Sequence, residues 1–365
     1  MSLALLLATE LEVDVAAGHT VFGVSATGPY VERVRRLGVT HVPVRSLTRS
    51  WNLPTDVRAF VELLRTIRGL DLDVLHTHNP KTGVMGRIVG RVTGVPVVVN
   101  TCHGLWARPS DAWRRRAFVY ALEGLACRFS DYELFQNAED ERTLRPALRA
   151  GRSRVVGNGV DLDRFRPDPD AGARVRAELG VGPDELLVGA VGRRVTEKGL
   201  VEFLHVARRL RGRARFVWVG PEEGPSPVAG ADDGSVTFLG ERSDMTALYS
   251  AMDVFVLPSH REGFSRAGME AAACGLPMVL TDIRGCRELG EHDTHLLLVP
   301  PGDAEALGET VARLLADAGV RSRLGRAARV TALERFDQRD VAAASLSTYA
   351  EVAREKGLPW TRTAV

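Results

Sequence analysis

Apolar runs with the length of strands alternate with amphipathic helical patterns along almost the whole chain. Such alternation is typical of right-handed βαβ units, whose parallel sheets carry helices on both faces, and it predicts an α/β fold. In the first half we predict strands at 19–25, 74–76, 95–99 and 132–136, and helices at 53–68, 83–93 and 112–128.

A second series of elements begins after the turn-rich stretch 157–169. Its predicted strands are 186–191, 215–219, 236–239, 254–257 and 278–280, and its predicted helices are 198–210, 244–250, 266–274, 304–318 and 320–334. Because 365 residues exceed the size of a single growing core, two doubly wound domains are expected, at 1–158 and 159–339. A final helix at about 340–365 is expected to pack back onto the first domain. Ligands of such sheets bind outside the carboxyl ends of the strands, so we expect the site in the cleft between the domains.

Composition excludes several classes of protein. The net charge of +2 gives no electrostatic case for nucleic acid, although residues 1–160 hold 21 Lys+Arg against 15 Asp+Glu. The four cysteines form no CxxC pair, which favours buried free thiols in a reducing cytoplasm. No apolar run is long enough to span a membrane, and the opening run lacks the basic flank of a signal peptide.

Two motifs in the second half carry candidate chemistry. Between a predicted strand and helix, the turn GRRVTEKG at 192–199 lets an anion approach backbone N–H groups, and Arg193 and Lys198 could neutralise a diphosphate. Two solvated surface charges are the alternative. In EGFSRAGME at 262–270, Glu262 lies in a loop and Glu270 in the following helix, where a carboxylate could accept both hydroxyls of a ribose. Simple stabilisation of the helix N-terminus is the alternative there.

The motifs GRRVTEKG, FLGERSDM, SHREGFSRAGMEAAACGLPMV and TDIRGCREL, in this order, resemble the C-terminal half of the family 4 retaining glycosyltransferases. These enzymes have the GT-B fold of two Rossmann-like domains facing across a cleft. HTHNPKTG, TCHGLW and NGVDLDRFRP in the first half agree, so the resemblance covers roughly residues 18–345. It is strongest to members that assemble bacterial capsule, cell envelope or related glycosides.

The resemblance implies a role for each matching residue. Arg193 and Lys198 would contact the donor diphosphate, Glu270 the ribose, and Glu262 the hydroxyls of the transferred sugar. The remaining donor positions would act through main-chain groups, at Gly192, Phe264, Ser265 and Arg266 near phosphate and sugar, and at Gly240, Glu241 and Arg242 around the base, commonly uracil. Many members have glycine in place of Ser265 and an aliphatic residue in place of Arg266, which leaves the donor sugar open.

On the acceptor side, a lone histidine such as His103 is more often structural than catalytic. The resemblance instead implies that His103 lies beside the donor sugar, so the predicted catalytic set is His103, Arg193, Lys198 and Glu262. His76 and His78 are further candidates for substrate contacts. The family's same-face mechanism needs no cofactor other than the nucleotide sugar, and no metal is expected because cations already face the diphosphate.

Family members open with a strand and a glycine-containing loop. Here Leu3, Leu7, Leu11 and Val15 recur every four residues and Gly18 is placed to end a helix, so residues 2–16 predict a helix instead. We therefore expect a first sheet that lacks one strand and has an edge to be covered. Either the chain starts upstream of Met1, or an impaired acceptor loop makes it a catalytically weak sugar-binding partner.

A second expectation concerns a surface of the first domain. Cationic residues flank apolar ones and could contact an anionic membrane or a lipid-linked acceptor; these are Arg108, Arg114, Arg115 and Arg116 around Leu105, Trp106, Trp113 and Phe118. A solvated helix end is the alternative.

The predicted activity is retaining transfer of a hexosyl or N-acetylhexosaminyl group from a UDP-sugar, in the cytoplasm or at the inner membrane face, to a small or lipid-linked acceptor. A non-hydrolysing nucleotide-sugar 2-epimerase is the alternative enzyme, and the lack of GxGxxG disfavours a nicotinamide oxidoreductase.

Overall fold

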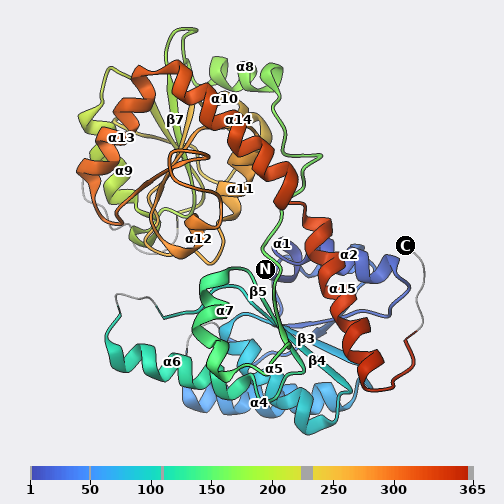
Figure 1. The fold of residues 1–365 in the computed structure, drawn as a ribbon. Coiled ribbons are helices and arrows are strands. Elements are labelled where there is room, and N and C mark those ends of the chain that lie inside the picture. The colour runs from blue at the N-terminus through green and yellow to red at the C-terminus, as the bar shows by residue number, and fades with distance from the viewer. Residues whose placement is uncertain (1, 49–50, 108–110, 223–232, 361–365) are drawn as a thin grey trace. The chain divides into compact units, whose positions relative to one another are not determined.

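The computed structural model describes residues 2–48, 51–107, 111–222 and 233–360 and divides the chain into two compact units (Figure 1). Unit 1 comprises residues 1–157 and 338–365, and unit 2 comprises residues 158–337. All strand pairs among the described residues are parallel. The predicted α/β fold with two Rossmann-like units is confirmed.

Unit 2 is built on one six-stranded sheet with the order β12-β11-β10-β7-β8-β9. Its strands are β7 (Leu187–Val191), β8 (Arg215–Val219), β9 (Thr237–Phe238), β10 (Val254–Leu257), β11 (Met278–Thr281) and β12 (Leu297–Val299). The chain runs from β7 outward to β9 and then returns to the other side of β7 with β10. This reversal between β7 and β10 is the position where open α/β sheets bind ligands, beyond the carboxyl ends of the strands.

Both faces of this sheet are buried, as the continuous apolar strands predict. Along β10, Val254 and Val256 join one hydrophobic core, and Phe255 and Leu257 join the other. The helices that cover the sheet are α8 (Pro169–Glu178), α9 (Leu200–Arg209), α10 (Met245–Ala251), α11 (Arg266–Ala273), α12 (Arg284–Arg287), α13 (Ala304–Ala316) and α14 (Ala318–Arg335), with a short 3₁₀ helix η2 (Thr196–Lys198).

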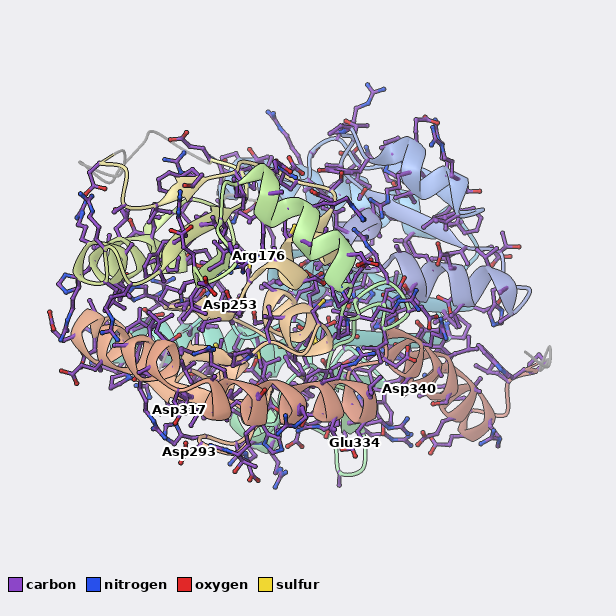
Figure 2. All side chains as sticks on the ribbon, turned by 90° about the horizontal axis from the view of Figure 1, so that it is seen from above. Arg176, Asp253, Asp293, Asp317, Glu334 and Asp340 are labelled. Carbon is purple, nitrogen blue, oxygen red and sulfur yellow. The ribbon has the colours of Figure 1, made fainter. Side chains whose placement is uncertain are left out.

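One ion pair ties the amino ends of the two central strands together. Arg176 of α8 places Nη1 3.0 Å from Oδ2 of Asp253, the residue before β10 (Figure 2). The same oxygen accepts a 2.7 Å hydrogen bond from the backbone N–H of Leu187, the first residue of β7. The strands that flank the reversal are therefore aligned from their starts.

Unit 1 contains a four-stranded sheet with the order β3-β4-β5-β6 and a separate two-stranded sheet, β1-β2. These strands are β1 (Phe22–Ser25), β2 (Thr40–Pro43), β3 (Val74–His78), β4 (Val97–Cys102), β5 (Tyr132–Phe135) and β6 (Ser153–Val155). The helices are α1 (Ser2–Leu5), α2 (Ala8–Ala16), α3 (Val31–Arg36), α4 (Leu53–Arg68), α5 (Pro80–Thr93), α6 (Trp113–Ala126), α7 (Ala138–Leu144) and α15 (Gln338–Glu355), with η1 (Arg145–Ala147) between α7 and β6. From α15, Tyr349 and Val352 pack against Val97, Val99 and Leu134 of the larger sheet.

The start of the chain is helical, as predicted, but not continuous. The helix breaks between α1 and α2, which allows both Ala4 and Leu7 to be buried in one apolar cluster with Leu11. Gly18 follows α2 with a positive φ of 85°, as expected for a residue that ends a helix. As predicted, no strand precedes β1 among the described residues. The strands of unit 1 form two sheets instead of one, because β1 pairs only with β2, and β3 pairs only with β4.

A buried ion-pair network in unit 1 gives a test of the fold. Arg87 of α5 is 1% exposed and pairs with Glu123 and, at 2.9 Å, with Glu133. Arg87→Met leaves two buried carboxylates without their cation, so we expect the opening free energy of unit 1 to fall by about 3–5 kcal/mol. Hydrogen exchange of the β4 amides measures that free energy directly.

Arg91 provides the matched control for this test. Its guanidinium lies 2.8 Å from Asp131 but is 36% exposed, so Arg91→Ala should cost only about 0–1 kcal/mol. Equal losses in both variants would contradict the account of a buried network.

Candidate functional site

The reversal between β7 and β10 brings two loops into contact, residues 192–199 after β7 and residues 258–265 after β10. Gly199 has φ +77°, and a Cβ at this position would lie 2.0 Å from the carbonyl oxygen of Pro258. The backbone N–H of His260 also donates to the carbonyl oxygen of Glu197 at 2.9 Å. Only a glycine at position 199 permits this close approach, so Gly199 allows the two loops to make contact.

Two of the predicted catalytic residues form an ion pair across these loops. Lys198 Nζ lies 2.7 Å from Glu262 Oε1, and both side chains are largely buried, at 19% and 12% exposed. Arg193 lies in the same loop as Lys198, directly after Gly192. The structure therefore places a cation suited to phosphate and a carboxylate suited to sugar hydroxyls side by side at the carboxyl edge of the sheet.

Glu270, the predicted ribose ligand, is held in a fixed orientation on α11. Tyr249 donates its hydroxyl to Oε2 at 3.0 Å, and Arg266 donates Nε–H to Oε1 at 3.1 Å. Burial raises the pKa of Glu270, and the charge of Arg266 opposes that rise. The carboxylate keeps lone pairs for further donors, which suits a pair of ribose hydroxyls.

The departures from the family pattern at the start of α11 have structural reasons. Ser265 is the N-cap of this helix, and its Oγ accepts the backbone N–H of Gly268 at 3.2 Å. Serine stabilises this position better than glycine, the residue found there in many members of the family that the chain resembles. Arg266 covers Glu270, and the Phe264 ring is buried against Phe336 at 5.6 Å between ring centroids. A ligand could therefore contact mainly the backbone of Phe264.

The predicted base-binding segment follows β9. The carbonyl oxygen of Gly240 accepts the backbone N–H of Gly220 at 2.7 Å, and Gly240 has φ +65°. Arg242 pairs with Asp244 and Glu178, each at 2.7 Å, and these two carboxylates raise the pKa of its guanidinium. Because that guanidinium is engaged and the side chain of Glu241 is exposed, the main chain is the part of this segment suited to a base.

His103 belongs to unit 1, whereas the other predicted catalytic residues belong to unit 2. It directly follows β4, and its Nε2 lies 3.0 Å from Nδ1 of His78 at the end of β3. Burial lowers the pKa of His103 to about 4 and that of His78 well below its usual value. Both imidazoles are therefore neutral near pH 7 and act as hydrogen-bonding groups rather than as charges.

Sequence reasoning missed several partners in these sites. The hydrogen bond from the Tyr249 hydroxyl to Glu270 could not be predicted from the sequence, because Tyr249 lies in the apolar pattern of α10. His76 was left open as a substrate contact, and its ring bonds instead to protein: Nδ1 lies 2.6 Å from the Tyr349 hydroxyl and Nε2 lies 2.7 Å from Thr101 Oγ1.

Comparison with known proteins bears directly on these sites. Residues 5–164 match the model of Glycosyltransferase Family 4, and residues 185–317 match that of Glycosyl transferases group 1. The chain is 30% identical over 288 residues to the Escherichia coli UDP-Gal:alpha-D-GlcNAc-diphosphoundecaprenol alpha-1,3-galactosyltransferase, covering 75% of this chain and 74% of that protein. The chain belongs to the family 4 glycosyltransferases. The predicted family is confirmed.

Other similar proteins agree with the family 4 assignment. The N,N'-diacetylbacillosaminyl-diphospho-undecaprenol alpha-1,3-N-acetylgalactosaminyltransferase of Campylobacter jejuni is 27% identical over 346 residues, which cover 92% of each chain. The Anabaena protein HepE in complex with UDP superposes with a TM-score of 0.75 at 20% identity, over 94% of this chain and 96% of that one. This family 4 glycosyltransferase is thus a GT-B enzyme that transfers a hexosyl group from a nucleotide sugar. Among the described helices, none has both the length and the apolar character needed to cross a membrane.

We expect Glu270→Ala to weaken the binding of UDP about ten- to hundredfold, because a charge-assisted hydrogen bond contributes about 1.5–3 kcal/mol. Calorimetric titration of UDP measures this change. Glu241→Ala is the matched control: its exposed side chain is not assigned a contact, so the affinity should not change. An unaltered affinity in Glu270→Ala would remove the ribose assignment.

Proposed function

We propose that this family 4 glycosyltransferase moves a hexosyl or N-acetylhexosaminyl group from a UDP-sugar to a lipid-linked acceptor, with retention of the anomeric configuration. The observation that carries the proposal is the Lys198–Glu262 pair at the strand-order reversal, with Glu270 held on the helix that follows. The UDP donor of the Escherichia coli relative and the UDP complex of the Anabaena neighbour support the choice of donor.

The protein's main contribution to the reaction is electrostatic. Negative charge accumulates on the UDP diphosphate as the bond to the sugar breaks, and Arg193 and Lys198 are the cations assigned to it. Lys198 is held in this position by its 2.7 Å contact with Glu262 and turns from that carboxylate to the phosphate when the donor binds. Glu262 then exchanges the ammonium group for hydroxyls of the transferred sugar.

Retention follows from attack on the same face that the diphosphate leaves. A phosphate oxygen of the leaving group accepts the proton of the attacking hydroxyl, so no enzymic nucleophile is required. His103 would serve as a neutral hydrogen-bonding group beside the sugar, which agrees with its low pKa of about 4.

The names of two relatives support a lipid-linked acceptor, because both act on sugars attached to diphosphoundecaprenol. On α6 of unit 1, Trp113 and Phe118 are 71% and 63% exposed, and Arg114 and Arg115 are exposed beside them. Exposed aromatic side chains next to arginines suit the headgroup region of an anionic membrane.

The surface differs from the predicted patch in part. Leu105 is buried at 4% exposure and does not belong to it. Trp106 is half-buried and stacks on Trp51 at 5.1 Å, and Arg108 lies outside the described residues. Helix α4 also carries a stripe of exposed apolar residues. Its exposed members are Leu53, Val57 and Val61, and both α4 and α6 pack against α5.

Transfer should survive removal of divalent cations by EDTA, because Arg193 and Lys198 supply the positive charge that a metal would otherwise bring. Lys198→Ala should reduce kcat at least about a hundredfold, since preorganised groups that stabilise developing charge typically contribute about 10²–10³. Release of UDP from the donor measures both effects. Loss of transfer in EDTA, restored by Mg²⁺ or Mn²⁺, would show that the diphosphate site is built differently.

Arg208→Ala is the control for that assay. Like Lys198, Arg208 is a cation paired with a carboxylate, at 2.6 Å from Asp233. Its side chain is 43% exposed on α9, outside the proposed donor site. Its loss should leave kcat unchanged, which separates the diphosphate contact from a general loss of positive charge.

Membrane contact gives a separate test. The double change Arg114→Ala with Arg115→Ala should reduce binding to anionic vesicles about thirtyfold at low salt, because each basic residue near such a surface contributes about 1 kcal/mol. Trp113→Ala should reduce binding at all salt concentrations. Vesicle sedimentation measures both, with Leu333→Ala, an exposed apolar change in unit 2, as the control. If vesicle binding is the same in the arginine and tryptophan variants as in the wild type, this surface does not contact the membrane.

A further inference from the structure

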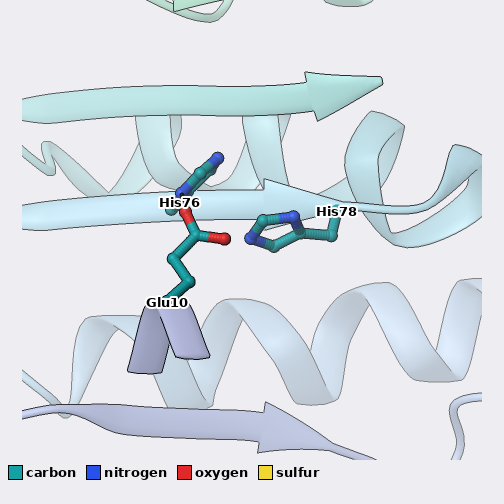
Figure 3. A group of neighbouring side chains, drawn as sticks. All are labelled: Glu10, His76 and His78. Carbon is teal, nitrogen blue, oxygen red and sulfur yellow. Dashed lines mark ion pairs between the residues drawn. The ribbon is translucent and has the colours of Figure 1, made fainter. Parts of the chain in front are cut away.

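Three residues of the kinds that bind metals converge in unit 1: Glu10 of α2 and His76 and His78 of β3 (Figure 3). One potential ligand atom from each lies within 4.8 Å of the other two. His76 and His78 share one face of the strand because they are two positions apart. We refer to these three residues as the Glu–His cluster.

Each imidazole of the Glu–His cluster is oriented by a partner outside it. His76 places Nε2 2.7 Å from Thr101 Oγ1, and His78 places Nδ1 3.0 Å from His103 Nε2. Protein metal sites use this arrangement, in which a ligating histidine donates its second ring N–H to a neighbouring acceptor. The ring nitrogen that remains on His76, Nδ1, lies 3.2 Å from Glu10 Oε1.

Two buried carboxylates lie in or next to the cluster, one helical turn apart on α2. Glu10 Oε1 has His76 Nδ1 at 3.2 Å as its partner, whereas Asp14 Oδ1 has no hydrogen-bond partner among the residues that the structure describes. Unsatisfied buried oxygens of this kind are rare, because each costs free energy that a hydrogen bond or a cation would recover. The site thus combines two oriented imidazoles with a buried carboxylate, and a second buried carboxyl group lies beside it.

We propose that Glu10, His76 and His78 bind a divalent transition-metal ion of the zinc type. Two imidazole nitrogens and one carboxylate oxygen form a ligand set that suits Zn²⁺, whereas Mg²⁺ and Ca²⁺ prefer oxygen ligands throughout. Zn²⁺ binds such ligands at about 2.0–2.2 Å, so the three atoms, which lie within 4.8 Å of one another, would have to move closer around the ion. A water molecule or another protein oxygen completes the tetrahedron.

The Tyr349 hydroxyl, 2.6 Å from His76 Nδ1, uses the nitrogen that the metal would take. It therefore competes with the ion rather than binding it. A metal on Nε2 of His78 also requires that ring to carry its proton on Nδ1, from which it donates to His103 Nε2. An occupied site would thus fix the hydrogen bonding of His103. The inference does not depend on the proposed transfer reaction.

Titration of the metal-free, full-length protein with Zn²⁺ by calorimetry, and with Co²⁺ by its visible absorption, tests the proposal. We expect one ion per chain, and an affinity that falls more than about tenfold in Glu10→Gln and in His78→Ala, because even outer partners of metal ligands contribute about 10–100-fold. Tyr349→Phe should bind Zn²⁺ at least as tightly as the wild type.

His205→Ala is the matched control, because His205 forms a surface pair with Glu305 at 2.8 Å outside the cluster and should not alter the affinity. Zn²⁺ should raise the unfolding temperature of the wild type and of His205→Ala, but not that of Glu10→Gln. Hydrogen exchange of the β4 amides reports whether each variant keeps the fold of unit 1. Absence of Zn²⁺ binding in the wild type, or equal binding in Glu10→Gln and His78→Ala, would overturn the proposal.

Discussion

The contact between the loops after β7 and β10 is the constraint on which the proposed donor site depends. Gly199 permits it, because any side chain there would collide with the carbonyl group of Pro258. The contact sets Lys198 against Glu262 at 2.7 Å in a largely buried position. In a partly buried ion pair, the loss of hydration offsets much of the attraction between the charges. The Lys198–Glu262 pair is therefore not explained by a contribution to the stability of the fold. Its position is better explained by the charges that a nucleotide sugar brings.

Several elements could be predicted from their patterns. The helix 53–68 has the predicted bounds because of its amphipathic period, and the strands 215–219 and 254–257 because each is a continuous apolar run. The short elements α3, β2 and β12 were not predicted. They form because tertiary packing buries Val34 and Leu297.

Local spacing made Lys198, Glu262 and Glu270 candidates and the family resemblance implied their roles, yet the contacts that they make depend on the fold. Tyr249 reaches Glu270 from another helix, and Glu10 reaches His76 from a distant part of the sequence. Neither pairing leaves a periodic or spaced pattern. For the same reason the sequence could not separate buried Leu105 from exposed Trp113, since both are apolar residues beside arginines.

The central claim is that Lys198 exchanges Glu262 for phosphate when the donor binds. UDP carries no sugar, so its binding must break the ion pair without offering Glu262 a new partner. Calorimetric titration of UDP into Glu262→Gln tests the claim most directly, because glutamine keeps the shape and removes the competing charge. We expect UDP to bind more tightly to Glu262→Gln than to the wild type, while transfer becomes slower. Equal or weaker UDP binding would contradict the exchange.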